Sequence, residues 1–184
     1  TFNDCTAECG SYFALTHCVN GWQEEVADIT VTGGDIHTKK ECVLVKSHNM
    51  MLDLCDVNIS SDKGVLVHTI VNDDPCATKV TKDVFGVNVV MTDMDVKGDL
   101  IHEDTTREMW VILNSTQLTG AIQHANVAFD KGSKWTATAD SDVVFVTDVE
   151  PAQIDAPAGV TITAKGAEAG EFALASGGKL IVTA

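Results

Sequence analysis

Basic and aromatic residues are scarce in this 184-residue chain. Lysine and arginine together number 12 against 27 acidic residues, which leaves a formal net charge of −15, and aromatic residues make up 5%. Because binding to a polyanion needs clustered basic side chains, the charge argues against nucleic acid as a partner. It argues against an anionic membrane surface for the same reason.

Long apolar runs are absent as well. No stretch approaches the roughly 20 apolar residues that a membrane-spanning helix needs, so we expect no membrane insertion. The chain begins at Thr1 without a charged and apolar leader. We therefore expect a mature secreted form whose signal has been removed, or a fragment.

Motifs of common catalytic and cofactor sites are also missing. The pairs Gly33-Gly34 and Gly177-Gly178 lack the lysine, hydroxyl residue and helix that follow a phosphate-binding loop. No nucleophile elbow surrounds a serine. We therefore expect no catalytic residue, no cofactor and no metal.

Cysteine is confined to the first 76 residues. The six cysteines are Cys5, Cys9, Cys18, Cys42, Cys55 and Cys76. An even number in a chain with secreted character predicts three disulfides in an oxidising compartment, and 15 pairings are open. The spacing of Cys5, Cys9 and His17-Cys18 also allows a zinc site, although no Cys-x-x-Cys pair is present.

Residues 1–25 differ in pattern from the rest. Phe2, Cys5, Cys9 and Phe13 recur at steps near four, which predicts a compact disulfide knot or a short amphipathic helix. From residue 26 onward β-branched residues dominate. We therefore divide the chain into a cysteine-rich N-terminal cap, residues 1–25, and a β domain, residues 26–184.

Extended segments recur at near-regular spacing in the second half. Their first residues, 16 to 21 positions apart, are Val89, Trp110, Val127, Val143, Val160 and Leu180. A repeat of this length, closed by small residues, predicts an all-β solenoid in which each turn stacks on the one before. We expect Val127, Val143 and Val160 to be buried in one column, with Trp110 near it.

Three blocks resemble a known architecture. Residues 93–101 (DMDVKGDLI), 118–122 (LTGAI) and 130–138 (DKGSKWTAT) are similar to the rungs of secreted right-handed parallel β-helix proteins, such as bacterial surface adhesins and the pectate-lyase-like superfamily. The resemblance covers about residues 28–183. It implies a single-stranded right-handed parallel β-helix, an architecture that carries lyases, hydrolases, adhesins and inert stalks alike.

Some residues suit chemistry found in such proteins. The resemblance to polysaccharide lyases makes the single arginine, Arg107, which lies near Asp93, Asp95 and Asp99 in the sequence, a candidate base, and Asp93 and Asp95 could share a cation such as calcium. A solvated acidic face is the plainer interpretation. His48 and His68, and likewise His102 and His124, are about one repeat apart and would lie side by side. The sequons at Asn58 and Asn114 allow N-glycosylation in a secretory pathway.

The sequence therefore predicts a non-enzymatic, secreted or cell-surface protein with a structural or adhesive role. Its last strand, residues 180–183, carries no visible cap, so we expect self-association into a homo-oligomer or head-to-tail filament. The alternatives are a carbohydrate-active enzyme or a module that binds surface glycans. Exposed aromatic side chains would favour these alternatives, and the candidates are Trp22, Trp110, Trp135 and Tyr12.

Overall fold

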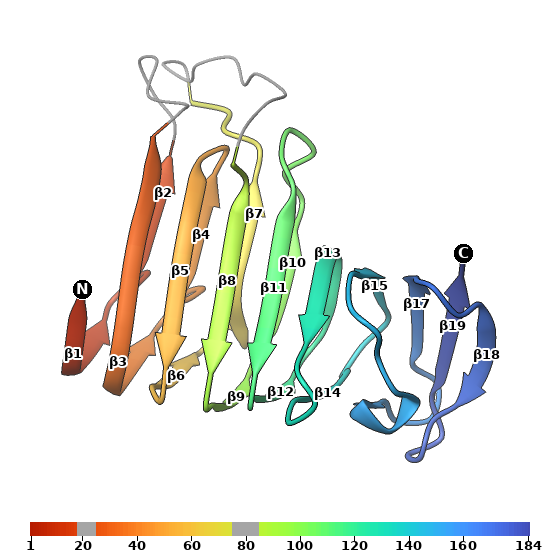
Figure 1. The fold of residues 1–184 in the computed structure, drawn as a ribbon. Coiled ribbons are helices and arrows are strands. Elements are labelled where there is room, and N and C mark those ends of the chain that lie inside the picture. Colours follow the sequence, from red (N-terminus) through yellow and green to blue (C-terminus); the bar gives the residue numbers. More distant parts are fainter. Residues whose placement is uncertain (18–24, 75–84) are drawn as a thin grey trace.

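The computed structural model describes residues 1–17, 25–74 and 85–184. The described chain consists almost wholly of β-strands, most of them paired in parallel (Figure 1). The single helical segment within those ranges is the 3-10 turn η1 (Pro151–Gln153). The predicted all-β class with parallel strands is confirmed.

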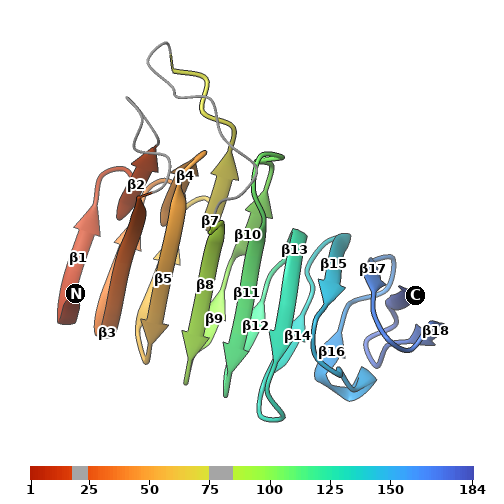
Figure 2. The same cartoon turned by 45° about the horizontal axis from the view of Figure 1, so that its top comes forward.

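The larger sheet has 15 strands, and its hydrogen-bonded order runs out along one layer and returns along a second. The first layer holds β1 (Phe2–Cys9), β3 (Val26–Thr38), β5 (Asn49–Cys55), β8 (Val87–Thr92), β11 (Met109–Asn114) and β13 (Ile122–Phe129). The returning layer holds β10 (Asp99–His102), β7 (Val65–Ile70), β4 (Val43–Lys46) and β2 (Ala14–His17). Figure 2 shows the two layers side by side.

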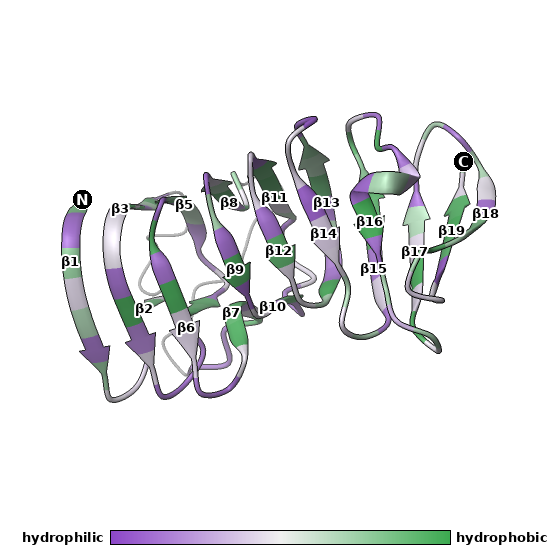
Figure 3. Cartoon of the chain, turned by 90° about the horizontal axis from the view of Figure 1, so that it is seen from below, coloured by the Kyte–Doolittle hydropathy of each residue, from purple (hydrophilic) through white to green (hydrophobic). Residues whose placement is uncertain are grey.

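The remaining strands extend this sheet or form a second one. Past β13 the larger sheet continues through β15 (Ser141–Phe145), β17 (Thr161–Lys165) and β19 (Lys179–Thr183), with β18 (Gly170–Ala173) antiparallel to β19 and β6 (Asn58–Ser61) paired with the end of β3. The smaller sheet contains β9 (Asp95–Lys97), β12 (Gln117–Thr119), β14 (Lys134–Thr136) and β16 (Ile154–Asp155). Along β9 and β12 hydrophilic and hydrophobic residues alternate (Figure 3), as expected for strands with one buried face.

Strand β13 belongs to both layers of the larger sheet. Its residues 126–129 pair with β11, whereas Ile122 and Gln123 pair with β10. The ladder therefore continues around the bend, and the strands form one curled sheet that wraps through 338°. The predicted single-stranded right-handed parallel β-helix, or β-solenoid, is wrong. The spacing of the repeats predicts which strands pair in parallel. It does not predict whether the hydrogen-bonded ladder continues from one layer into the other.

Over the described residues 1–17, the predicted knot or short helix is also wrong. Cys5, Ala7 and Cys9 are half-buried and alternate with exposed residues, so β1 has the two-residue period of a strand. A step of four residues fits this period as well as it fits a helical turn. Both β1 and β2 pair with strands of the larger sheet, and residues 18–24 lie outside the described part.

Apolar side chains stack between the layers in columns that the parallel register defines. Leu52 pairs with Val89, Val89 with Val111, and Val111 with Val127, and all four are fully buried. The predicted column of Val127, Val143 and Val160 is wrong. A register shift next to His124 places Val143 opposite Ala125 instead, and Trp110 points to the outer face between buried Met109 and Val111.

The first-layer strands turn towards the smaller sheet at a stacked corner. Asp4, Gly33, Asp56, Asp93 and Ser115 occupy equivalent register positions, and all have left-handed φ angles between 48° and 67°. Short polar side chains and glycine tolerate this conformation, which β-branched residues avoid. The corner is therefore formed by one residue with a left-handed backbone in each strand, repeated at the same register position.

A second corner depends on close backbone contact between Gly98 and Gly120. A Cβ atom on Gly120 would lie 2.1 Å from the carbonyl oxygen of Gly98. The Gly120 carbonyl also accepts a 2.8 Å hydrogen bond from Nε1 of Trp135, which is fully buried. The absence of a side chain at Gly120 therefore allows the adjacent strands to approach closely at the edge of the core.

Replacing Gly120 with alanine should force these strands apart and lower the free energy of unfolding by about 1–3 kcal/mol. Urea denaturation measures the loss. Gly10→Ala is the matched control, because no atom lies within 4 Å of the Cβ position there. Equal stability of the two variants would contradict the close contact.

Candidate functional site

Two strands at the N-terminal end of the larger sheet have a neighbour on one side only. Among the described residues, β1 pairs with β3 and β2 pairs with β4, and these two strands end the hydrogen-bonded order. Phe2 and Leu15 are 42% and 45% exposed. The rings of Phe2 and Phe13 lie edge to face with centroids 5.2 Å apart. We call β1, β2 and these three side chains the N-terminal edge.

The opposite end of the sheet is built differently. Strand β19 has β17 in parallel on one side and β18 antiparallel on the other, so its backbone is paired along both edges. The prediction that the last strand is open is therefore wrong. The outermost strand here is β18, which is only four residues long.

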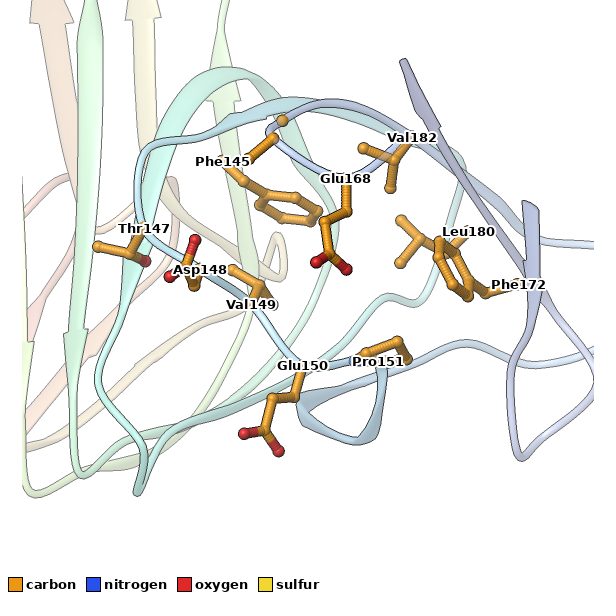
Figure 4. Close-up of a pocket in the computed structure, with 12 residues that line it drawn as sticks. Phe145, Thr147, Asp148, Val149, Glu150, Pro151, Glu168, Phe172, Leu180 and Val182 are labelled. Carbon is orange, nitrogen blue, oxygen red and sulfur yellow. The ribbon is translucent and has the colours of Figure 1, made fainter. Parts of the chain in front are cut away.

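A cavity of about 350 Å³ lies at this C-terminal end (Figure 4). Its walls come from the end of β15, the segment before η1, the β17–β18 connection and strands β18 and β19. The apolar lining residues are Phe145, Val149, Pro151, Phe172, Leu180 and Val182, and the acidic ones are Asp148, Glu150 and Glu168. We call it the C-terminal pocket. No basic residue of the described ranges lines it.

Arg107, the candidate base, is inaccessible. Its side chain is fully buried, and Nη1 donates to Asp104 Oδ2 and Thr106 Oγ1, each at 3.2 Å. Its Nε and Nη2 have no hydrogen-bond partner among the described residues. Buried this deeply, the guanidinium cannot reach a polysaccharide, so its position supports a structural role.

The candidate calcium ligands do not form a common face either. Asp95 is in β9, but Asp93 lies before that strand in the left-handed corner, so the alternation expected for a strand does not relate them. The Asp99 carboxylate accepts a 2.8 Å hydrogen bond from the Ala121 amide. Within the described ranges, no group of three or more histidine, cysteine, aspartate or glutamate residues is placed to hold a metal ion.

The histidine pairs behave differently. His68, in β7, has Leu44 and Ile101 as register partners, so it does not lie opposite His48. His102 and His124 each follow directly after the paired residues Ile101 and Gln123, and both line a smaller cavity. His124 Nε2 lies 3.3 Å from Asp142 Oδ2. The register thus brings one of the two predicted pairs together.

His102 is held in one neutral form by two neighbours. It is 7% exposed, and its Nε2 donates to the Arg107 carbonyl at 3.0 Å, because a carbonyl only accepts. Nδ1 then accepts from the Thr69 hydroxyl. Burial lowers the pKa of His102 below its ordinary 6.5, while the hydrogen bond to the carbonyl opposes this shift. Burial lowers the pKa of His48 as well.

The aromatic candidates for sugar stacking are largely withdrawn from the surface. Trp135 is fully buried, and the Tyr12 ring is covered by Lys40 Nζ at 4.9 Å from its centroid. Trp110 is half-buried on the outer face of β11, between Asn88 and Asn126 of the adjacent strands. Trp22 lies outside the described residues. A glycan site therefore remains a prediction that would depend on Trp110.

The two sequons differ in exposure. Asn58 is exposed on β6, and its amide donates to Asp35 Oδ1 at 2.9 Å. Asn114 is half-buried, and the hydroxyl residue of its sequon, Thr116, is fully buried and donates to the Met91 carbonyl. The surface is therefore better suited to a glycan at Asn58.

The four described cysteines are free thiols. Cys42 is fully buried, whereas Cys5, Cys9 and Cys55 are half-buried, and Cys18 and Cys76 lie outside the described residues. No disulfide therefore joins any two of these four cysteines, as the predicted disulfide-rich cap would require. Cys42 donates its Sγ–H to the Ser60 carbonyl at 3.3 Å and packs as a small apolar residue. Burial raises the pKa of the Cys42 thiol to about 11.

Thiol labelling tests this arrangement. At pH 8 a pKa of about 11 leaves roughly one Cys42 thiol in a thousand ionised, so native protein should alkylate there far more slowly than at Cys5, Cys9 and Cys55. Peptide mass spectrometry after a time course with iodoacetamide measures the rates. Resistance of all four sites in denaturant without reductant would show disulfides instead.

The His102 pKa predicts how stability depends on pH. The unfolded chain has the ordinary histidine pKa of 6.5, so below this pH it binds more protons than the folded chain, and the free energy of unfolding falls on acidification. His102→Gln keeps a donor for the Arg107 carbonyl and an acceptor for Thr69, but it cannot be protonated.

The variant should therefore lose less stability between pH 7 and pH 5, by up to about 1.4 kcal/mol per pH unit. Urea denaturation at a series of pH values measures this difference. A residual slope from His48 is expected in both proteins. An unchanged slope would show that His102 is already protonated in the folded chain.

Comparisons give no relative from which a function could be transferred. No helix in the described ranges combines the length and apolar character required to cross a membrane. Comparison with protein-family models, with curated proteins and with solved structures gives no match. The resemblance to secreted β-helix proteins therefore stays a prediction from the sequence, and the geometry of the two ends of the sheet is the basis for a functional proposal.

Proposed function

We propose that this protein is a non-enzymatic structural or adhesive protein that associates with a second copy of itself through the N-terminal edge. The observation that carries the proposal is that β1 and β2, the two strands that end the hydrogen-bonded path of the larger sheet, lie at one end of it, each with one side unpaired among the described strands. Unpaired strand edges recruit other β-strands. The exposed Phe2 and Leu15 add apolar area beside them.

A two-fold dimer fits this edge better than a filament. Two copies of the eight-residue strand β1 would pair antiparallel across a two-fold axis, so that each edge satisfies the other. A head-to-tail filament would instead have to join β1 to the four-residue strand β18. Two copies of β1 have equal lengths, whereas β1 and β18 do not, and this favours the two-fold dimer over the filament.

Charge opposes the association and makes it dependent on salt. Each chain carries a formal charge of −15, and Asp4 and Glu8 lie on β1 itself. Screening shortens the range of this repulsion, so higher ionic strength should strengthen the dimer. A secreted or cell-surface location is part of the proposal and derives from the sequence alone.

Sedimentation equilibrium of the wild type and two variants tests the proposal. Leu15→Glu should weaken dimerisation by about tenfold or more, because it places a charge in the apolar part of the contact. Val144→Glu is the matched control, since Val144 is 37% exposed on β15 at a distance from the N-terminal edge.

Two results would contradict the proposal. One is a wild-type protein that stays monomeric up to about 1 mM in high salt, because a functional edge should bind within that range. The other is an equal effect of Leu15→Glu and Val144→Glu. Negative-stain images that show filaments would support self-association but overturn the two-fold geometry.

A further inference from the structure

The C-terminal pocket combines an apolar wall with carboxylates that lack a positive partner. Asp148, Glu150 and Glu168 are exposed at the pocket and form no salt bridge in the described part of the chain. Figure 4 shows Glu168 directed between the rings of Phe145 and Phe172. Three negative groups thus surround one apolar cavity without neutralisation.

The two phenylalanine rings form part of the apolar wall of the pocket. Phe145 and Phe172 are both half-buried, and Phe145 is fixed from behind by an edge-to-face contact with Phe129, centroids 6.2 Å apart. Leu180 and Val182, both buried, complete the apolar wall.

We propose that the C-terminal pocket binds a small organic ammonium ion that carries an apolar or aromatic group. The apolar part packs against Phe145, Phe172 and Leu180, and the ammonium group lies between Glu168 and Asp148. The volume of about 350 Å³ is in the range of small-molecule sites. This inference does not depend on dimerisation, because β18 and β19, which help to line the pocket, lie at the opposite end of the sheet from β1 and β2 (Figure 1).

Other ligand classes fit less well. An anion would meet three carboxylates and no basic side chain. A neutral apolar molecule would displace water from these carboxylates without replacing its hydrogen bonds. A divalent metal ion prefers several oxygen ligands converging on one point, and no such group of residues occurs in the described ranges.

The probes are 2-phenylethylammonium, its neutral counterpart 2-phenylethanol and the anion phenylacetate. We expect the ammonium ion alone to bind the full chain, with chemical shift changes in a 1H–15N spectrum concentrated at Phe145, Phe172 and residues 147–150. Raising the salt concentration to about 0.5 M should weaken binding, because the attraction between the charges is screened.

Two isosteric variants separate the local charge from the overall charge. Glu168→Gln should raise the Kd of the ammonium ion by about fivefold or more, since one exposed charge contact is lost. Glu171→Gln removes the same charge three residues away, from an exposed position that does not line the pocket, and should leave the Kd unchanged. Circular dichroism checks that both variants are folded.

Three results would overturn the proposal. The first is that 2-phenylethylammonium does not bind at about 10 mM. A Kd above that concentration would be too weak for a ligand site of this kind. The second is equal binding of 2-phenylethanol. The third is an equal effect of Glu168→Gln and Glu171→Gln, which would show general attraction of cations to an acidic protein.

Discussion

The structure depends on the parallel register between neighbouring strands of the larger sheet. Strands in such a sheet lie about 4.8 Å apart, so each inward side chain rests on its register partner. Leu52, Val89, Val111 and Val127 form one fully buried column in this way. Because the core is a set of columns, a change of register by one residue would expose all of them together.

The corners preserve this register from strand to strand. Residues with left-handed backbone follow β5, β8 and β11 at Asp56, Asp93 and Ser115. The amides of Asp56 and Asp93 donate to carbonyls at the end of the next strand, at 3.1 and 3.0 Å, and the Ser115 amide donates to the Asp130 carboxylate. At the other corner Gly98 and Gly120 approach too closely for any side chain. Backbone geometry therefore favours short polar residues at the first corner and glycine at the second.

The two ends of the sheet differ, and this difference organises our functional proposals. At the N-terminal edge the ladder ends, among the described strands, with unpaired backbone and exposed Phe2 and Leu15. At the other end β18 covers β19, and the covering strand forms one wall of the C-terminal pocket. One end thus suits contact with another β-strand, and the other encloses a cavity of small-molecule size.

The sequence by itself determined the all-β class, the parallel pairing of its repeated segments and the acidic surface, because strand period and composition are local properties. Only the tertiary structure decided that the ladder continues around β13, that Arg107 is buried and that β19 is covered by β18. The C-terminal pocket was not predicted either, since Phe145, Glu168 and Phe172 come from different segments. The repeat spacing suggested columns, but the bulge beside His124 shifted Val143 to Ala125. Such features arise from contacts between distant strands, on which a local pattern has no influence.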